Sequence, residues 1–222
     1  MPFEWPANLV PVNIEVRPPR KTVGLNRSLS EFTQAVPSIR PPFGLSMEFS
    51  NLSGSEVLAY RALLGSFEGR ANTVRVPLFD LWAAGTSAQL GIGGSTHSDG
   101  TSFSDGALYM VEDLSGVLVT GVQGDRMITA DFGDYGPLLQ GGQYFGLGDH
   151  PYLATGVWWE GPVATIRCSR TLVADYWAQP LKLRPTMIAG LPDDDTGQMA
   201  LKFGYYGSPT LDLEERFDEP LF

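Results

Sequence analysis

The chain contains little charge, two histidines and a single cysteine. Charged residues are 18% of the 222 residues, and Cys168 is the only cysteine. A lone cysteine cannot form a disulfide within the chain, which argues against a disulfide-stapled secreted domain. No apolar run approaches the roughly 18 residues of a transmembrane helix, so no membrane span is predicted. Residues 1–16 lack the basic and apolar regions of a secretory leader, so we expect folding in a reducing cytoplasm.

Positive charge is also scarce. The 15 basic residues are outnumbered by 25 acidic ones, which gives a net charge of −10. Because a nucleic-acid surface needs clustered lysine and arginine, we predict no nucleic-acid recognition. Basic residues gather near the start of the chain and acidic ones near its end, so the two ends either attract each other between neighbouring subunits or lie separately in solvent. These residues are Arg17, Arg20, Lys21, Arg27 and Arg40, and Asp193, Asp194, Asp195, Asp212, Glu214, Glu215, Asp218 and Glu219.

Apolar and turn-forming residues, in contrast, are abundant. Apolar residues make up 43% of the chain and aromatic residues 11%, which supports a sizeable core and argues against disorder. The 26 glycines and 17 prolines divide the sequence into short segments throughout, a pattern typical of β proteins. We predict a mainly β fold, with an N-terminal β-sheet domain that carries one packed helix, followed by a small β-barrel or sandwich-like C-terminal part.

Alternation of apolar and polar residues predicts the strands. In residues 9–17 every second residue is apolar, so one side of a strand is expected to be half-buried. The apolar residues are Val10, Val12, Ile14 and Val16. Glu160-Gly161-Pro162 is expected to turn a hairpin. Further strands are predicted at residues 27–36, 43–51, 72–79, 107–113, 116–122, 125–132, 143–147, 152–160, 163–169, 181–189, 199–204 and 210–216.

One helix is predicted, over residues 53–69. Ser53 and Glu56, three residues apart, form a capping-box pattern, and Gly69 is a natural C-terminal stop. Apolar residues follow at spacings of three and four along one face, which is expected to pack on the N-terminal sheet. These residues are Val57, Tyr60, Leu64 and Phe67.

A loose stretch in the middle of the chain sets the predicted domain boundaries. Residues 85–106 are rich in glycine and serine, and the Ser-Asp-Gly of residues 98–100 is repeated at residues 104–106. A loop of this length buries too little surface to order itself, so we expect a neighbouring chain to order it. We therefore predict a β domain with one helix at residues 1–84, the Gly/Ser-rich loop at 85–106 and a C-terminal β-rich region at 107–222.

Residues that could carry chemistry do not converge in the sequence. His97 lies in the Gly/Ser-rich loop and His150 in a turn-like Gly-Asp-His-Pro, and neither has the spacing of a metal ligand. Cys168 lies in a strand-like run, where a buried, inert thiol is expected and not a nucleophile. Residues 193–197, Asp-Asp-Asp-Thr-Gly, could hold a hard cation, but they lack the ligand alternation of a calcium loop, so a solvated acidic turn is expected.

The pair Trp158-Trp159 allows a second hypothesis, a carbohydrate-binding β module that could be attached to a virion, with Tyr152 as a further sugar contact. Adjacent residues of a strand face opposite sides, so one tryptophan would stack on a sugar while the other lies in the core. Neither a Gly-x-Ser-x-Gly elbow nor a phosphate-binding Gly-x-x-x-x-Gly-Lys occurs in the sequence. We predict no enzymatic activity, no catalytic, cofactor-binding or metal-binding residues, and no cofactor.

Two segments resemble structural proteins of bacteriophage tails. Residues 61–77, RALLGSFEGRANTVRVP, combine a predicted helix, a Glu-Gly-Arg-Ala-Asn turn and a strand, and residues 98–106 are SDGTSFSDG. Both are similar to segments of the distal tail and tail-hub proteins of long-tailed bacteriophages, of the siphophage and gene-transfer-agent type. The similarity covers roughly residues 5–110, about half of the chain, and continues beyond as a pattern of short barrel-like strands.

This resemblance implies a structural protein of the virion tail, assembled in the cytoplasm of the host bacterium. Such proteins form a ring, usually of about six copies, that joins the tail tube to the baseplate or hub. The domain at residues 1–84 would build the ring, with strand edges of one subunit completed by the next. The implied partners are the protein itself, the tail tube protein and a hub or fibre protein. The family brings no catalytic residues with it.

Overall fold

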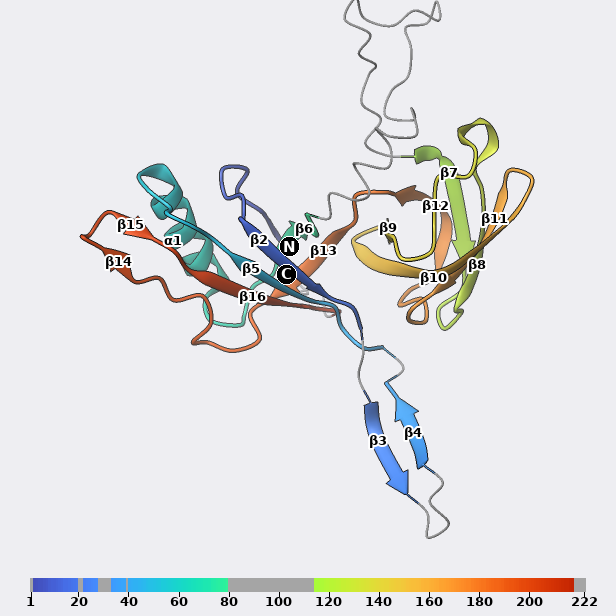
Figure 1. Ribbon diagram of the computed structural model, residues 1–222, viewed down its shortest axis with the longest axis horizontal. Coiled ribbons are helices and arrows are strands. Elements are labelled where there is room, and N and C mark those ends of the chain that lie inside the picture. Colours follow the sequence, from blue (N-terminus) through green and yellow to red (C-terminus); the bar gives the residue numbers. More distant parts are fainter. Residues whose placement is uncertain (1, 20–21, 28–32, 39, 80–113, 218–222) are drawn as a thin grey trace, which may run out of the picture. The chain divides into compact units, whose positions relative to one another are not determined.

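A computed structural model of the chain shows two compact units, each with its own core (Figure 1). The first unit contains Met1–Leu78 and Met187–Phe222, and the second contains Phe79–Thr186. The described residues form many strands and one α-helix, which confirms the predicted mainly β fold with a single helix. The structure describes residues 2–19, 22–27, 33–38, 40–79 and 114–217.

A six-stranded sheet forms the first unit. Its strand order is β1-β6-β13-β16-β5-β2, so strands from both ends of the chain are interleaved in one sheet. β1 pairs with β6 in parallel, whereas β16, β5 and β2 pair antiparallel. The strands are β1 (Phe3–Glu4), β2 (Asn13–Arg17), β5 (Gly44–Glu48), β6 (Val74–Pro77), β13 (Thr186–Gly190) and β16 (Thr210–Glu215).

The pair β5 and β16 shows why these segments form strands. Every second residue is apolar, so one side of each strand enters the core and the other carries polar groups. Leu45 lies opposite Leu213, and Met47 lies opposite Leu211. All four side chains are buried, which confirms the predicted strands in residues 43–51 and 210–216.

The first predicted strand is shorter than expected. β2 begins at Asn13, and only Ile14 and Val16 of the predicted apolar side are half-buried. Val10 and Val12 are exposed, so their predicted burial is wrong. Proline at position 11 has no N–H to donate and interrupts the ladder, which limits the strand to the residues that follow it.

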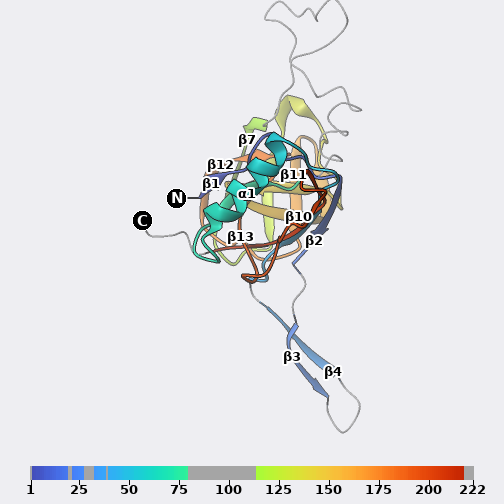
Figure 2. The same ribbon diagram turned by 90° about the vertical axis from the view of Figure 1, so that its left-hand side faces the viewer.

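The helix α1 (Ser55–Phe67) crosses in front of the strands of the first unit in Figure 2. Half of the predicted capping box forms, because the Glu56 carboxylate accepts the backbone N–H of Ser53 at 3.1 Å while no side chain caps the first turn. The helix ends where Glu68 adopts a left-handed conformation. No helix among the described residues is both long enough and apolar enough to cross a membrane.

The buried face of α1 differs from the prediction at one position. Val57, Tyr60 and Phe67 are buried as expected, but the third core residue is Leu63, whereas Leu64 is only half-buried. The Tyr60 hydroxyl donates to the carbonyl of residue 197 at 2.7 Å, and burial raises the pKa of this phenol above its usual value. The helix therefore packs through residues 57, 60, 63 and 67, as the 3.6-residue period allows.

Residues 22–27 and 33–37 form two paired strands where one strand was predicted at residues 27–36. β3 (Thr22–Arg27) and β4 (Thr33–Pro37) pair antiparallel, with Arg27 opposite Thr33. Because these two strands run antiparallel, residues 27–36 are not one strand, and the prediction is wrong. Alternation alone does not distinguish one long strand from two short strands that pair with each other.

A closed six-stranded barrel forms the second unit, which agrees with the predicted barrel. The strand order is β10-β11-β8-β7-β12-β9, and β9 closes the barrel by pairing with both β10 and β12. Glu160 pairs with Val163 across the turn, which confirms the predicted hairpin there. The elements are β7 (Leu114–Gly121), β8 (Met127–Asp131), the 3-10 helix η1 (Gly133–Tyr135), β9 (Tyr144–Leu147), β10 (His150–Glu160), β11 (Val163–Cys168) and β12 (Tyr176–Lys182).

The barrel core contains one fully buried cation. Arg170 donates to the carbonyl of Pro151 at 2.9 Å, and its guanidinium carbon lies 5.0 Å from the centre of the Tyr152 ring. The Tyr152 hydroxyl lies 2.9 Å from that of Tyr176 and accepts the N–H of Val173 at 3.1 Å. These contacts offset part of the cost of burying a charge and rigidify the barrel.

The division of the chain differs from the predicted boundaries. Residues 187–222 return to the first unit, whereas they were predicted to belong to a C-terminal region at 107–222. The predicted strand at 181–189 is in fact two strands, with β12 in the barrel and β13 in the sheet. Pro185 lies between them and breaks the hydrogen-bond ladder. The Gly/Ser-rich loop at 85–106 and the predicted strand at 107–113 lie outside the described residues.

Candidate functional site

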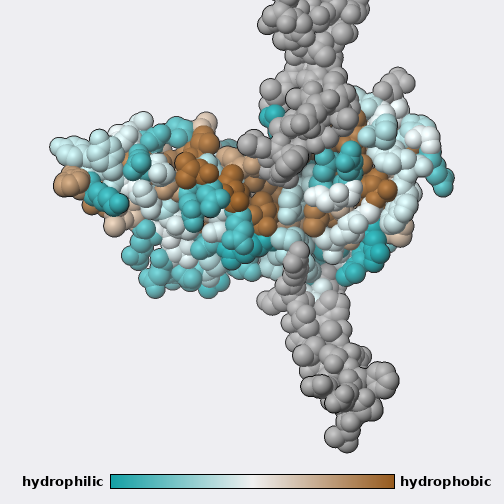
Figure 3. Space-filling model, viewed as in Figure 1, coloured by the Kyte–Doolittle hydropathy of each residue, from teal (hydrophilic) through white to brown (hydrophobic). Residues whose placement is uncertain are grey.

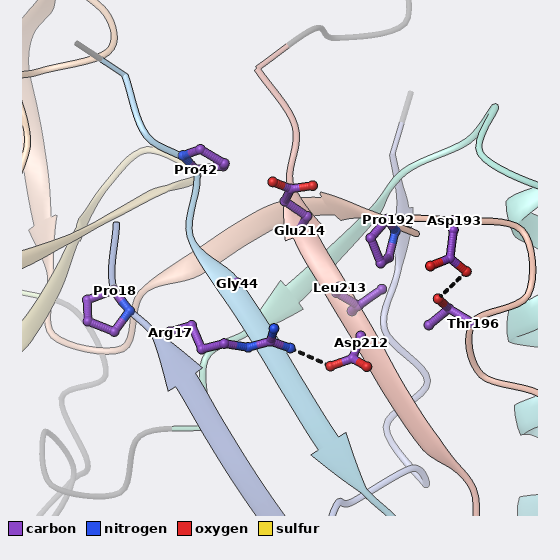
Figure 4. Close-up of a pocket in the computed structure, with 10 residues that line it drawn as sticks. All are labelled: Arg17, Pro18, Pro42, Gly44, Pro192, Asp193, Thr196, Asp212, Leu213 and Glu214. Carbon is purple, nitrogen blue, oxygen red and sulfur yellow. Dashed lines mark hydrogen bonds and ion pairs between the residues drawn. The ribbon is translucent and has the colours of Figure 1, made fainter. Parts of the chain in front are cut away.

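A hollow of about 390 Å³ lies over one end of β2, β5 and β16 (Figure 4). Arg17, Gly44 and Glu214 lie side by side on these three strands. The central glycine leaves the space between the two long side chains open, since a Cβ there would lie only 3.3 Å from the Arg17 Cβ. The hollow is lined by Arg17, Pro18, Pro42, Gly44, Pro192, Asp193, Thr196, Asp212, Leu213 and Glu214.

The hollow is acidic. Arg17 forms an ion pair with Asp212, and Asp193 accepts the Thr196 hydroxyl at 2.7 Å. Both partners of the ion pair are about half exposed, so the pair contributes ~0–1 kcal/mol to stability. With Glu214 included, three carboxylates accompany one guanidinium. This excess of negative charge favours contact with a cationic group of a partner over binding of an anion.

Three prolines fix the walls of the hollow. Pro18 follows β2, Pro42 precedes β5 and Pro192 follows β13. Proline has a fixed φ and no N–H to donate to a strand ladder. Each of these strands therefore begins or stops beside the hollow. These prolines therefore restrict the backbone at three edges of the hollow.

An aromatic hairpin tip is the second feature of the first unit. β14 (Leu201–Lys202) and β15 (Tyr206–Gly207) form a short antiparallel pair. At its end Phe203 is 93% exposed, Tyr205 73% and Tyr206 50%. These three side chains are called the aromatic tip below. Figure 3 shows a tan patch at the end of the first unit where Figure 1 places this hairpin.

The turn at this tip holds Phe203 in a strained conformation. Phe203 has a φ of 52° and Gly204 a φ of 74°, and the Tyr205 N–H closes the turn by donating to the carbonyl of Lys202 at 3.1 Å. Positive φ at both central positions is typical of a type I′ turn, which favours asparagine and glycine. A left-handed conformation costs a residue such as phenylalanine about 1–2 kcal/mol. An exposed aromatic residue at such a position indicates a role outside the fold.

Cys168 is buried, as predicted. It ends β11 with its side chain inside the barrel. Burial raises the pKa of its thiol to about 12, although the nearby Arg170 guanidinium acts in the opposite direction. The reactive thiolate is therefore almost absent at neutral pH.

The other candidates from the sequence do not come together. His150 is half-buried at the start of β10, whereas His97 lies outside the described residues. Asp193, Asp194 and Asp195 form an exposed turn in which Asp193 accepts the N–H of Asp195 at 3.1 Å. In the described part of the chain, no three His, Cys, Asp or Glu side chains gather closely enough to hold a metal ion.

The tryptophan pair divides as the strand geometry predicted. Trp158 is 52% exposed on the outer wall of the barrel. Trp159 is half-buried and packs edge-to-face on Phe132, with ring centres 5.0 Å apart. Tyr152 is fully buried in the core, so its predicted contribution to a sugar site is wrong. Trp158 is thus the member of this group that is available to a ligand.

Neither the hollow nor the aromatic tip was found from the sequence. Arg17 and Asp212 are 195 positions apart, so no local pattern joins them. The sequence did contain a signal for the aromatic tip, because Phe203-Gly204 is followed by two tyrosines. The tip was missed because a strand was predicted at residues 199–204, through the position of the turn. Comparison of the chain with protein-family models and with curated proteins gave no match.

Proposed function

We propose that this chain is a structural protein of a bacteriophage tail tip, where copies of it form a ring that joins the tail tube to the baseplate or hub. The observation that carries the proposal is the aromatic tip, with Phe203 93% exposed. Burial of such a side chain contributes about 1.5–3 kcal/mol, and the described residues of the chain do not bury it. The resemblance of residues 61–77 and 98–106 to tail-tip proteins supplies the biological setting.

A ring requires two different surfaces on each subunit, because its contacts run head to tail. The aromatic tip supplies an apolar projection. Val10 and Val12, which are both exposed, supply an apolar surface immediately before β2. β2 is also the last strand in the sheet order, so one of its edges pairs with no strand in the described part of the chain. We expect the tip of one copy to cover Val10 and Val12 of the next.

The acidic hollow supports a second contact within the same assembly. Its carboxylates, Asp193, Asp212 and Glu214, lie beside prolines that give it a fixed shape. A lysine or arginine of a tail tube, a hub or a neighbouring copy fits this charge. Charge of this kind orients partners and raises the association rate more than the affinity.

The proposal is tested by the association of the purified chain, measured by sedimentation velocity and electron microscopy. The wild-type chain is expected to form closed rings of about six copies, and Phe203→Ser is expected to shift the population toward monomer. Leu58→Ala is the matched control, because Leu58 is an exposed apolar residue of α1. It should leave the rings intact.

Antibody labelling of intact phage particles tests the location. Label at the junction between the tail tube and the baseplate is expected. A chain that stays monomeric at every concentration and is absent from tails would refute the structural role. Rings formed equally well by Phe203→Ser would remove the aromatic tip from the interface.

A further inference from the structure

A row of threonines that starts at the exposed Trp158 runs across the outer wall of the barrel. Trp158 on β10 lies opposite Thr165 on β11, and Thr165 lies opposite Thr129 on β8. The antiparallel register of β7 and β8 places Thr120 beside Thr129. Neighbouring strands are about 4.8 Å apart, so the row of four side chains is roughly 14 Å long.

The row faces outward because each strand alternates. In β8 the residues on either side of Thr129 are buried, and in β11 the residues on either side of Thr165 are buried. The core-facing positions are thus filled, and the hydroxyl groups lie on the opposite side. A surface of this kind offers both hydrogen-bond donors and acceptors without carrying charge.

The indole ring of Trp158 lies on the outer wall of the barrel and is open to solvent. A Cβ on Gly156 would lie 2.8 Å from Cη2 and 3.2 Å from Cζ2 of the indole, so the ring occupies the space above this glycine. Gly156 does not have a positive φ, and the backbone therefore does not require glycine at this position. Its lack of a side chain makes room for the ring, which is held in place with 52% of the residue exposed.

A second exposed aromatic ring lies beside a hollow of about 530 Å³. Tyr135 lines this hollow, and a Cβ on Gly116 would lie 3.5 Å from Cε2 and from the hydroxyl oxygen of Tyr135. Leu118 and Asp131 also line the hollow, and the register of β7 and β8 places them side by side in the row next to the threonines. Tyr135 thus lies at the β7 side of the same wall, against Gly116, four positions along the strand from Thr120.

Charge on this surface is sparse and negative. Asp131 accepts the N–H of Gly133 at 2.9 Å, which holds its carboxylate at the hollow. Glu160 lies in the same row, since Glu160 and Asp131 both pair with Val163. One cation, Arg167, lies at the edge of this surface, where it pairs with Gly156 beside Trp158. The two carboxylates outnumber this guanidinium, so the surface lacks the clustered cations that nucleic acids and sulfated glycans require.

We infer that this surface, from Trp158 across the threonines to Tyr135, binds a neutral oligosaccharide. The aromatic faces would stack on the apolar faces of sugar rings, and the threonine hydroxyls and the Asp131 carboxylate would hydrogen-bond to sugar hydroxyls. A site that combines apolar platforms with a few oriented polar groups is typical of small-ligand recognition. The inference concerns the second unit and does not depend on ring formation by the first.

The test is calorimetric titration of the full-length chain with maltohexaose, cellohexaose and N-acetylchitohexaose, each up to about 10 mM, which covers weak recognition. At least one is expected to bind, and Trp158→Ala is expected to weaken that binding by about tenfold or more. Gly156→Ala should also weaken it, because the added methyl group displaces the indole without removing a ligand contact. Val122→Ala, which shortens an exposed apolar residue of the same unit, should bind as the wild-type chain does.

Circular dichroism of each variant confirms that the fold is retained before affinities are compared. Failure of all three saccharides to bind the wild-type chain would overturn the inference. So would binding that neither Trp158→Ala nor Gly156→Ala weakens, since the ligand would then lie elsewhere. Preferential binding of single-stranded oligothymidylate would assign the surface to an anionic ligand and equally overturn it.

Discussion

Replacement of Phe203 by asparagine should stabilise the fold and weaken assembly at the same time. The residue has a φ of 52°, which costs a phenylalanine about 1–2 kcal/mol and an asparagine considerably less. Because the side chain is 93% exposed, its removal forfeits only about 0.3 kcal/mol of burial. We therefore expect the free energy of unfolding to rise by about 1 kcal/mol.

The assay is urea denaturation of the monomer at low concentration, followed by hydrogen exchange resolved to individual peptides. The midpoint should rise while the slope stays unchanged, because the exposed surface of the unfolded chain is nearly the same. Tyr205→Asn is the matched control. Tyr205 is an exposed aromatic residue of the same tip, but it does not have a positive φ. It should give no stabilisation.

Two outcomes would refute this reasoning. A loss of stability in Phe203→Asn would show that the ring makes contacts within its own chain, so the tip would not be free for a partner. A gain of stability without any loss of ring formation would show that the strain exists for another reason. Stabilisation combined with loss of assembly is the pattern expected of a residue retained for binding at the expense of the fold.

Two further predictions follow from burial. Leu63→Ala should lower the free energy of unfolding by about 2–5 kcal/mol, because Leu63 is buried. Leu64→Ala should lower it by less, because Leu64 is half-buried. Equal losses for the two variants in urea denaturation would contradict the assigned helix face. Cys168 should resist alkylation in the folded chain near pH 8, because burial raises its pKa to about 12. The stability that the buried neutral thiol contributes should be fully present below the unfolded pKa near 9 and lost as pH rises toward 12. Rapid labelling of Cys168 in the native chain at pH 8 would contradict its burial.

Local pattern was sufficient for most individual strands and for the helix. β5, β11 and β16 each bury every second residue, and alternation within a strand depends only on backbone geometry. The turn between Glu160 and Val163 was predictable for a similar reason, because Gly161 supplies the positive φ that a tight hairpin requires. These elements are determined by residues only a few positions apart.

Long-range pairing was not predictable in the same way. The backbone N–H of Phe43 donates to the Glu215 carboxylate, 172 positions away, and nothing local to either residue indicates this contact. The return of β13 and β16 to the first sheet was missed for this reason, although Pro185 could have shown that residues 181–189 are not one strand. The choice of Leu63 over Leu64 is equally non-local, because both fit the helical period and the packing of the sheet decides between them.

Exposed functional residues are the hardest to predict from sequence, because apolar residues are normally taken as core. Trp158 and Trp159 have the same side chain in adjacent positions, yet only Trp159 packs against Phe132. The strand rule predicted that one of them would be exposed without telling which. The glycine at position 156 was the available clue, because it leaves room for a ring to lie over the strand.

The connectivity of the chain keeps the two proposed functions separate. β6 and β13 are neighbours in the sheet of the first unit, and the whole second unit is the continuous segment between them. A continuous segment that enters and leaves through neighbouring strands can form its own core without breaking the sheet that carries it. Substitutions at the aromatic tip therefore act on a different core from substitutions at Trp158. We therefore expect a substitution at the aromatic tip to abolish ring formation and leave saccharide binding intact. A substitution at Trp158 should abolish saccharide binding and leave ring formation intact.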